Sequence, residues 1–326
     1  MGEIDWMQQG PFGLMVHYLK QVKPKDGAPI EDWDELVDAF PVASFCREVE
    51  ATGAKWLIFT LGQNNGYYCS PNPVLEALLP GRCSKRDLAL EIATNLEARG
   101  IRFIAYLPSE VDTADEALRD AFGWDIDPSD KSVFQERYMD FIRSWSERWG
   151  AAVDGWWFDG CYDAAVMSFM RTHGWNNGRF DYASWAGAAK AGNPAAVVSM
   201  NPGADEMGYA FAEQDYLGGE ANDLKQLPTG PLVDGMQWQA LVWMDCFWMH
   251  DRDAEGTIPP PRFTEDEMYA YTAACRRQGG AVTWNIGVYQ EGTLSEPSAD
   301  RLARVAERLR EMDEEIRMER RMKRDG

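Results

Sequence analysis

Short apolar segments alternate with segments of helical periodicity along almost the whole chain of 326 residues. The helical segments at 42–52, 84–99, 132–149, 161–173 and 264–278 each stop at a glycine, a common residue just after a helix C-terminus. The apolar segments between them indicate strands buried on both faces, as in parallel βα units. Eight such units predict a (β/α)8 barrel of α/β class. The predicted strands are 12–17, 55–60, 102–106, 155–158, 196–200, 209–212, 240–246 and 281–286.

A doubly wound open sheet is the alternative architecture, but no GxGxxG motif follows the first strand. No linker divides the chain, since Pro259-Pro260-Pro261 is typical of a stiff loop before a helix. Residues 1–326 are therefore predicted to form a single domain. The last predicted helix covers about 298–323, and the charges in its second half predict a solvated helix end, with a homo-oligomer contact as the alternative.

The charge of the chain limits its partners. With 53 acidic and 32 basic residues, the formal net charge is −21, which disfavours nucleic acids and anionic membrane surfaces. No run of about 18 apolar residues could span a membrane. The first residues also lack the basic and apolar regions of a signal peptide. Six scattered cysteines without a CxxC pair favour free buried thiols in a reducing compartment, so we expect a cytoplasmic protein.

Polar and aromatic residues stand at the carboxyl ends of the predicted strands. The clearest case is the run Gly155-Trp156-Trp157-Phe158-Asp159-Gly160, in which three aromatic residues lead to a carboxylate. Asp159 could cap the following helix, or it could act in catalysis, because barrel active sites lie at this end of the strands. The other ends and the residues that follow them contribute His17, Gln63, Asn64, Asn65, Tyr106, Glu110, Asn201, Glu213, Glu220, Asp245, Trp248, Trp284 and Asn285.

This set is rich in carboxylates, amides and aromatic rings and contains no Lys or Arg. Phosphate sites need cations or glycine-rich amide cradles, so a neutral sugar is the better match. Sugar hydroxyls pair with amides and carboxylates, and two carboxylates across such a pocket could hydrolyse a glycosidic bond. Three scattered histidines predict no metal site, and no cofactor is expected. Glu110 and Asp245 are interpreted as structural, and Tyr106 and Trp284 could be pocket wall or barrel core.

Ordered motifs between about residues 10 and 310 resemble the α-L-fucosidases of glycoside hydrolase family 29. The segment 12–18 resembles that family's FGxFxHWG opening, and segments 54–67 and 85–103 resemble its AGAKY…TxKHHDGF and KRDLV…GLKFGxYYS stretches. Residues 157–160 resemble WFDG, and residues 279–293 resemble the closing GGNLLLNVGP…DGT. The resemblance implies a retaining exo-glycosidase that acts by double displacement on a small-molecule or oligosaccharide substrate.

The resemblance also implies roles for single residues. Asp159 matches the family nucleophile. Glu220 matches an acid/base Glu found in some members, and Glu213 is the alternative. Sugar-contacting positions are matched by His17, Trp157 and Trp248, and more loosely by Glu31, which stands in an EW-like element.

Several departures separate the chain from the family pattern. The family's His-His-Asp, which binds fucose hydroxyls, is replaced by Gln63-Asn64-Asn65, and its Asn-Asp-Arg by Ser199-Met200-Asn201. Its Trp-Glu before the seventh strand appears as Trp238-Gln239, and we expect no C-terminal β-sandwich. Amides still bind hydroxyls but present other donors and acceptors, which predicts altered glycone specificity for a terminal deoxy or neutral sugar. The alternatives are a barrel that binds carbohydrate without hydrolysing it and a metal-dependent isomerase or hydrolase.

Overall fold

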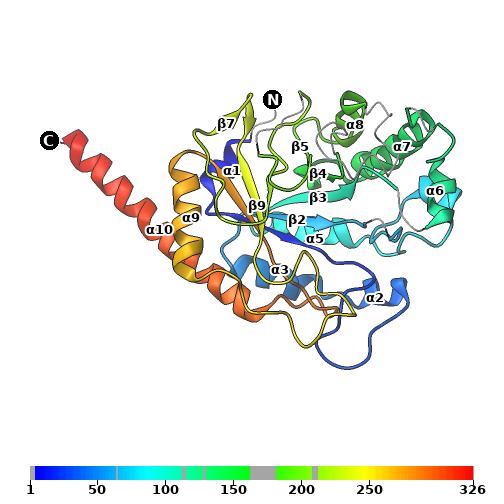
Figure 1. The fold of residues 1–326 in the computed structure, drawn as a ribbon, viewed down its shortest axis with the longest axis horizontal. Helices are drawn as coiled ribbons and strands as arrows, with labels where there is room; N and C mark the ends of the chain where they lie inside the picture. Colours follow the sequence, from blue (N-terminus) through cyan, green and yellow to red (C-terminus); the bar gives the residue numbers. More distant parts are fainter. Residues whose placement is uncertain are drawn as a thin grey trace.

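The computed structural model describes residues 4–63, 65–111, 115–127, 130–161, 181–207 and 212–325. Within these residues, eight parallel strands form one sheet in the order β5-β4-β3-β2-β1-β10-β9-β6 (Figure 1). The strands of this sheet are β1 (Gly13–Val16), β2 (Trp56–Thr60), β3 (Arg102–Pro108), β4 (Gly155–Asp159), β5 (Val197–Met200), β6 (Glu220–Ala221), β9 (Gln239–Trp243) and β10 (Ala281–Asn285). A separate antiparallel hairpin joins β7 (Leu232–Val233) to β8 (Met236–Gln237).

The chain from residue 215 to residue 221 closes the sheet into a barrel between β5 and β9. On one side Asp215 N donates to Val198 O at 2.7 Å. On the other side Leu241 N donates to Gly219 O at 2.6 Å, and Glu220 pairs in register with Leu241. The predicted (β/α)8 barrel is therefore confirmed.

The sixth strand lies further along the chain than the sequence predicts. Residues 209–211 of the predicted strand 209–212 lie outside the described residues, and the sixth place in the barrel belongs to residues 215–221. Two glycines explain why an apolar pattern misses this strand. A Cβ on Gly218 would lie 2.6 Å from Asn201 Cα, and one on Gly219 would lie 2.3 Å from Gln239 O. Glycine is used where neighbouring backbones approach this closely.

Side chains alternate between the barrel interior and the surrounding helices, as the period of two in a strand requires. Met15, Ile58, Ile104, Trp157 and Leu241 belong to the interior cluster, while their neighbours in sequence pack toward the helices. The short helix α1 (Asp5–Gln9) packs against the amino end of the barrel, where Met7 joins the same interior cluster. The same alternation decides which residues face the opening at the carboxyl end.

Helices surround the barrel. The helix α7 (Ser132–Trp149) matches its predicted range, whereas α5 (Leu88–Glu97) begins after Asp87 and not at Ser84, because the Asp87 carboxylate accepts a hydrogen bond from Leu90 N at 3.4 Å. Nearly all of the predicted helix 161–173 lies outside the described residues. The other helices are α2 (Trp33–Ala39), α3 (Val42–Ala51), α4 (Pro73–Leu78), α6 (Glu116–Phe122), the 3₁₀ turn η1 (Gly150–Ala152), α8 (Tyr182–Ala189), α9 (Glu265–Arg277) and α10 (Glu296–Asp325).

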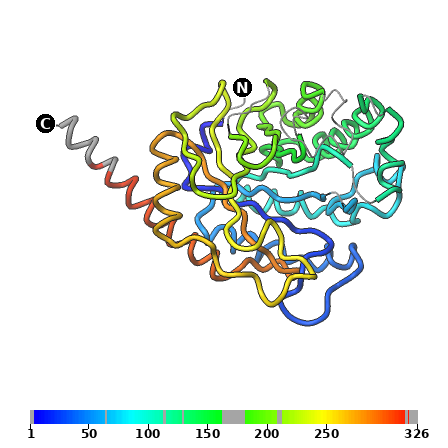
Figure 2. The backbone as a smooth tube through the Cα atoms, in the orientation of Figure 1, coloured from blue at the N-terminus to red at the C-terminus, as the bar shows by residue number. Residues whose placement is uncertain are grey.

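The C-terminal helix α10 packs with its first half and then leaves the body of the protein. Leu302, Val305 and Leu309 are buried, and Arg276 of α9 pairs with Asp313 at 3.0 Å. Beyond this contact the helix extends past α9 (Figures 1 and 2). No helix in the described part of the chain is long and apolar enough to cross a membrane. All six cysteines carry free thiols, five of them buried, as the scattered spacing predicts.

Candidate active site

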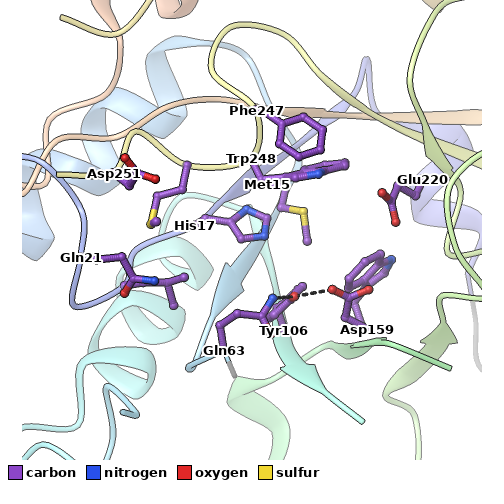
Figure 3. A pocket seen from close by; sticks show the side chains of 13 residues that line it. Met15, His17, Gln21, Gln63, Tyr106, Asp159, Glu220, Phe247, Trp248 and Asp251 are labelled. Atoms are coloured by element: carbon purple, nitrogen blue, oxygen red, sulfur yellow. Dashed lines mark hydrogen bonds between the residues drawn. The ribbon is translucent and has the colours of Figure 1, made fainter. Parts of the chain in front are cut away.

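A cavity of about 380 Å³ opens at the carboxyl end of the barrel strands (Figure 3). It contains seven of the residues that the sequence predicts for the site: His17, Gln63, Tyr106, Trp157, Asp159, Glu220 and Trp248. Its other lining residues are Met15, Leu19, Gln21, Phe247, Met249 and Asp251. None of these thirteen described residues is Lys or Arg, so the lining has no fixed positive charge for a phosphate or carboxylate ligand.

Asp159 projects into the cavity from the last position of β4, two residues after the inward-facing Trp157. Its carboxylate accepts hydrogen bonds at both oxygens. Tyr106 Oη donates to Oδ2 at 2.6 Å, and Asn201 Nδ2 and Gly160 N each donate to Oδ1 at 2.9 Å. These donors come from three different strand ends, so they hold the carboxylate in one orientation toward the cavity.

Asn201 also contacts Glu220 and thereby limits the distance between the two carboxylates. Its side-chain oxygen accepts from Gly203 N at 3.3 Å, which turns the amide nitrogen toward the acids. That nitrogen lies 2.9 Å from Asp159 Oδ1 and 2.6 Å from Glu220 Oε2. These two oxygens are therefore no more than 5.5 Å apart, the sum of the two lengths. Figure 3 shows the two carboxylates on the same side of the cavity.

The surroundings of Glu220 favour its protonated form. Burial raises the pKa of this carboxyl to about 7 from its ordinary value of 4.5, and the negative charge of Asp159 acts in the same direction. The hydrogen bond from Asn201 opposes this shift because it stabilises the carboxylate. A large fraction of Glu220 is thus protonated near neutral pH.

His17 is held as a neutral ring with one nitrogen free to accept. Asn285 Nδ2 donates to Trp248 O at 2.9 Å, so Asn285 Oδ1 faces His17 Nδ1, also at 2.9 Å, and Nδ1 must carry the proton. Burial lowers the pKa of His17, while the hydrogen bond to Asn285 and the charge of Asp159 oppose that change. The neutral ring therefore presents Nε2 as an acceptor for a hydroxyl group.

Gln63, Tyr106 and Trp157 form the wall beside Asp159. Gln63 Nε2 donates to Tyr106 Oη, which in turn donates to Asp159. The rings of Tyr106 and Trp157 stack with centroids 5.1 Å apart and an interplanar angle of 18°. Trp157 Nε1 donates to Gly218 O at 3.1 Å, so its polar atom is satisfied within the wall. Trp284, by contrast, is buried beside Phe263 and Tyr271 on the helix side and belongs to the core.

Three of the described residues that the sequence predicts for the site do not line the cavity, and a fourth predicted residue, Asn64, lies outside the described residues. Asn65 donates to Oε1 of the lining residue Gln21 at 2.7 Å. Glu213 lines a different cavity of about 460 Å³. Glu31 has 68% of its side chain exposed and pairs with Arg252 at the surface, so the loose match to an EW element does not bring it to the pocket. Of the two candidate acids, only Glu220 shares a cavity with Asp159.

The sequence places Asn201 and Asn285 at strand ends but assigns neither a role, and it misses several loop residues that line the cavity. The inward parity of the two asparagines on their strands could have indicated their role. Gln21, Phe247 and Asp251 lie in loops, where no periodicity indicates the direction of a side chain. Asp245 is structural as predicted, since its buried carboxylate accepts from Gly287 N at 2.9 Å and from Ser298 Oγ at 2.7 Å. The described residues contain no group of three or more His, Cys, Asp or Glu that could hold a metal ion.

A (β/α)8 barrel with an Asp and a Glu side by side at its carboxyl end has the architecture of a glycoside hydrolase. The sequence profile of the Alpha-L-fucosidase family matches residues 6–314, and the chain belongs to this family of glycosidases. The family resemblance drawn from the sequence motifs is thereby confirmed. No curated protein sequence matches the chain.

Solved structures of related enzymes share the fold. An endo-fucoidan hydrolase of glycoside hydrolase family 107, P5AFcnA, is 13% identical with a TM-score of 0.67, and the match covers 94% of each chain. Alpha-L-fucosidase isoenzyme 1 from Paenibacillus thiaminolyticus is 18% identical with a TM-score of 0.61, covering 94% of this chain and 75% of that one. Alpha-L-fucosidase AlfC from Lactobacillus casei, solved with its α-L-fucose product, is 13% identical with a TM-score of 0.61, covering 95% and 98%.

Proposed function

We propose that the protein is a retaining exo-glycosidase that removes a terminal α-L-fucose or a closely related neutral deoxy sugar. Asp159 is the nucleophile and Glu220 is the acid/base. The observation that carries the proposal is the shared Asn201 amide, which limits the nearest carboxylate oxygens to a separation of 5.5 Å. Retaining glycosidases have their two carboxyl groups about 5–5.5 Å apart, whereas inverting enzymes need roughly 6.5–9.5 Å to admit water.

In the first step, Glu220 gives its proton to the glycosidic oxygen while Asp159 attacks the anomeric carbon. The bond from that carbon to the leaving oxygen breaks, the leaving alcohol departs, and a glycosyl ester forms on Asp159. In the second step, Glu220 takes a proton from water, whose oxygen attacks the same carbon and releases Asp159. Tyr106 and Asn201 hold the Asp159 carboxylate toward the anomeric carbon throughout.

The electrostatics of the pair support this exchange of roles. The charge of Asp159 helps to raise the pKa of Glu220 to about 7, so Glu220 carries the proton that the first step requires. Once Asp159 becomes an ester, its charge is lost and the pKa of Glu220 falls. The resulting carboxylate can then act as the base of the second step.

The cavity favours a neutral glycone. The acceptor Nε2 of His17 and the amide of Gln63 can pair with sugar hydroxyls, and Tyr106 and Trp157 offer apolar ring surface. A cavity of about 380 Å³ lies at the lower end of the range for small-molecule sites and suits one sugar unit. The AlfC structures, which hold α-L-fucose and Fuca(1,6)GlcNAc, support α-L-fucose as the first sugar to test.

Matched variants on a panel of aryl glycosides test the assignment. Asp159→Ala should lower kcat/KM by at least about a thousandfold, and added azide should restore turnover by attacking from the vacated side. Glu220→Gln should lower kcat/KM by about a hundredfold or more for poor leaving groups, while Glu213→Gln, seven residues earlier, should stay within about twofold. Full activity of Asp159→Ala would refute the proposal.

The alternative is a barrel that binds sugar without hydrolysing it. That reading expects Asp159 to stand far from every Glu, and the bridging Asn201 argues against it. Binding of α-L-fucose to the unmodified protein with no turnover of any glycoside in the panel would favour it over the hydrolase.

A further inference from the structure

Aromatic rings continue from the cavity to the protein surface. Trp248 lies against His17 with ring centroids 5.8 Å apart, Phe247 follows at 5.8 Å, and Trp243 at the end of β9 follows at 5.4 Å. Trp248 and Phe247 both line the cavity, yet Phe247 is 64% exposed. Figure 3 shows its ring at the edge of the cavity above Trp248. A single exposed apolar residue is common on protein surfaces, but an exposed ring that continues the wall of a cavity indicates a ligand-binding surface.

The backbone that presents these rings is strained. Trp248 has φ of 61°, which is unusual for a bulky residue, and Met249 N donates to Phe247 O across it at 2.7 Å. This three-residue turn has the positive φ of the rare γ-turn. The hydrogen bond from Asn285 Nδ2 to Trp248 O, at 2.9 Å, helps to hold it. Such strain persists where the surrounding structure enforces it and is concentrated at ligand sites.

Trp243 supports Phe247 from the outer side. The guanidinium of Arg262 covers the Trp243 ring at 3.2 Å from its centroid and donates to Trp243 O at 3.2 Å. Trp243 Nε1 donates to Asn222 Oδ1 at 3.4 Å. Asn222 comes directly after the strand β6, which begins at Glu220 and pairs with β9. The aromatic row therefore runs from the cavity wall toward the strand that carries Glu220.

We propose that Phe247, held by Trp243 and Trp248, forms a subsite for a neutral sugar on the leaving-group side of the bond that is cut. This inference rests on the proposed function, because the leaving oxygen must lie within hydrogen-bond reach of Glu220. A sugar ring has C–H groups on its faces, and the negative face of an aromatic ring attracts them. Arg262 is already engaged by the Trp243 ring and by two backbone carbonyls, so the subsite does not call for an anionic sugar. The substrate is thus an oligosaccharide whose second unit is neutral.

The experiment compares leaving groups with and without a ring. α-L-Fucosyl fluoride releases fluoride, which has no ring to bind in the subsite. Fucosylated neutral disaccharides, including Fuca(1,6)GlcNAc, release a sugar that can bind there. Phe247→Ala should lower kcat/KM for at least one disaccharide by about fivefold or more and leave the fluoride within about twofold, and Phe247→Tyr should keep the ring and restore turnover. Ile126→Ala, at another exposed apolar residue, is the matched control. Equal effects on both substrate types, or no effect on either, would overturn the subsite.

Calorimetric binding of the same disaccharides separates this inference from the proposed function. If no substrate is turned over but a disaccharide binds and Phe247→Ala weakens that binding at least about fivefold, the hydrolase proposal fails, and only the sugar contact at Phe247 stands. If the unmodified protein neither turns over nor binds any disaccharide, both fail. If disaccharides bind and Phe247→Ala leaves that affinity and all turnover unchanged, only the subsite fails.

Discussion

Replacing Glu220 with glutamine removes a buried titratable carboxyl while keeping an oxygen that can accept from Asn201. In the folded protein the pKa of Glu220 is raised to about 7 from an ordinary value of 4.5. A raised carboxyl pKa means that the folded state holds the proton more tightly than the unfolded chain does. The stability from this group is therefore fully present below about pH 4.5 and is lost as the pH rises through 7.

The size of this effect follows from the pKa shift. Each pKa unit corresponds to about 1.4 kcal/mol, and integration between pH 5 and pH 8 gives a loss on the order of 2–3 kcal/mol in the free energy of unfolding. The Glu220→Gln variant should not show this loss of stability, because glutamine does not titrate. Relative to the unmodified protein, the variant should thus gain roughly 2–3 kcal/mol of stability between pH 5 and pH 8, while its hydrolytic activity falls.

Urea unfolding of both proteins at pH 5 and pH 8, monitored by tryptophan fluorescence, measures this difference. The comparison requires that the two proteins have equal m-values. Glu267→Gln is the control. Hydrogen bonds from Thr264 in the α9 capping box lower the pKa of Glu267, so the stability that this carboxylate gives is present above about pH 4.5 and is lost only at lower pH. The stability difference between this variant and the unmodified protein should therefore be nearly the same at pH 5 and at pH 8. A stability difference between Glu220→Gln and the unmodified protein that stays constant across this pH range would refute the reasoning about Glu220.

Three further changes test the contacts around the site. Tyr106→Phe removes the 2.6 Å hydrogen bond to Asp159 and should lower kcat/KM about tenfold to a hundredfold, with an unchanged circular dichroism spectrum. Asn201→Ala removes the bond that lowers the pKa of Glu220, so the alkaline limb of the kcat/KM profile should move to higher pH; a shift to lower pH would contradict this. Asp245→Ala leaves the donors of Gly287 and Ser298 without their acceptor and should cost about 3 kcal/mol of stability, seen as a lower unfolding midpoint in urea.

Much of the barrel and part of the site could be predicted from local pattern. Apolar runs such as 56–60 and 155–158 are buried on both faces, and helices such as α7 end at glycine, so these elements follow from short-range physics. Asp159 could be placed in the same way, because it follows the inward-facing Trp157 by two residues at a strand end. The sixth strand could not be predicted in this way. Its glycines allow neighbouring backbones to approach closely, and glycine adds nothing to an apolar pattern.

The sequence by itself determined the alternation of strands and helices, the family, and the carboxylate at the end of β4, because these depend on periodicity and on residues close in the chain. Only the tertiary structure shows that Glu220 and Glu213, which are seven residues apart in the sequence, line different cavities. It also decided that one amide of Asn201 bridges both acids and that Phe247 extends the cavity wall. The physical reason is that these contacts depend on the register between neighbouring strands and on loop conformation, and the spacing of residues along the chain specifies neither.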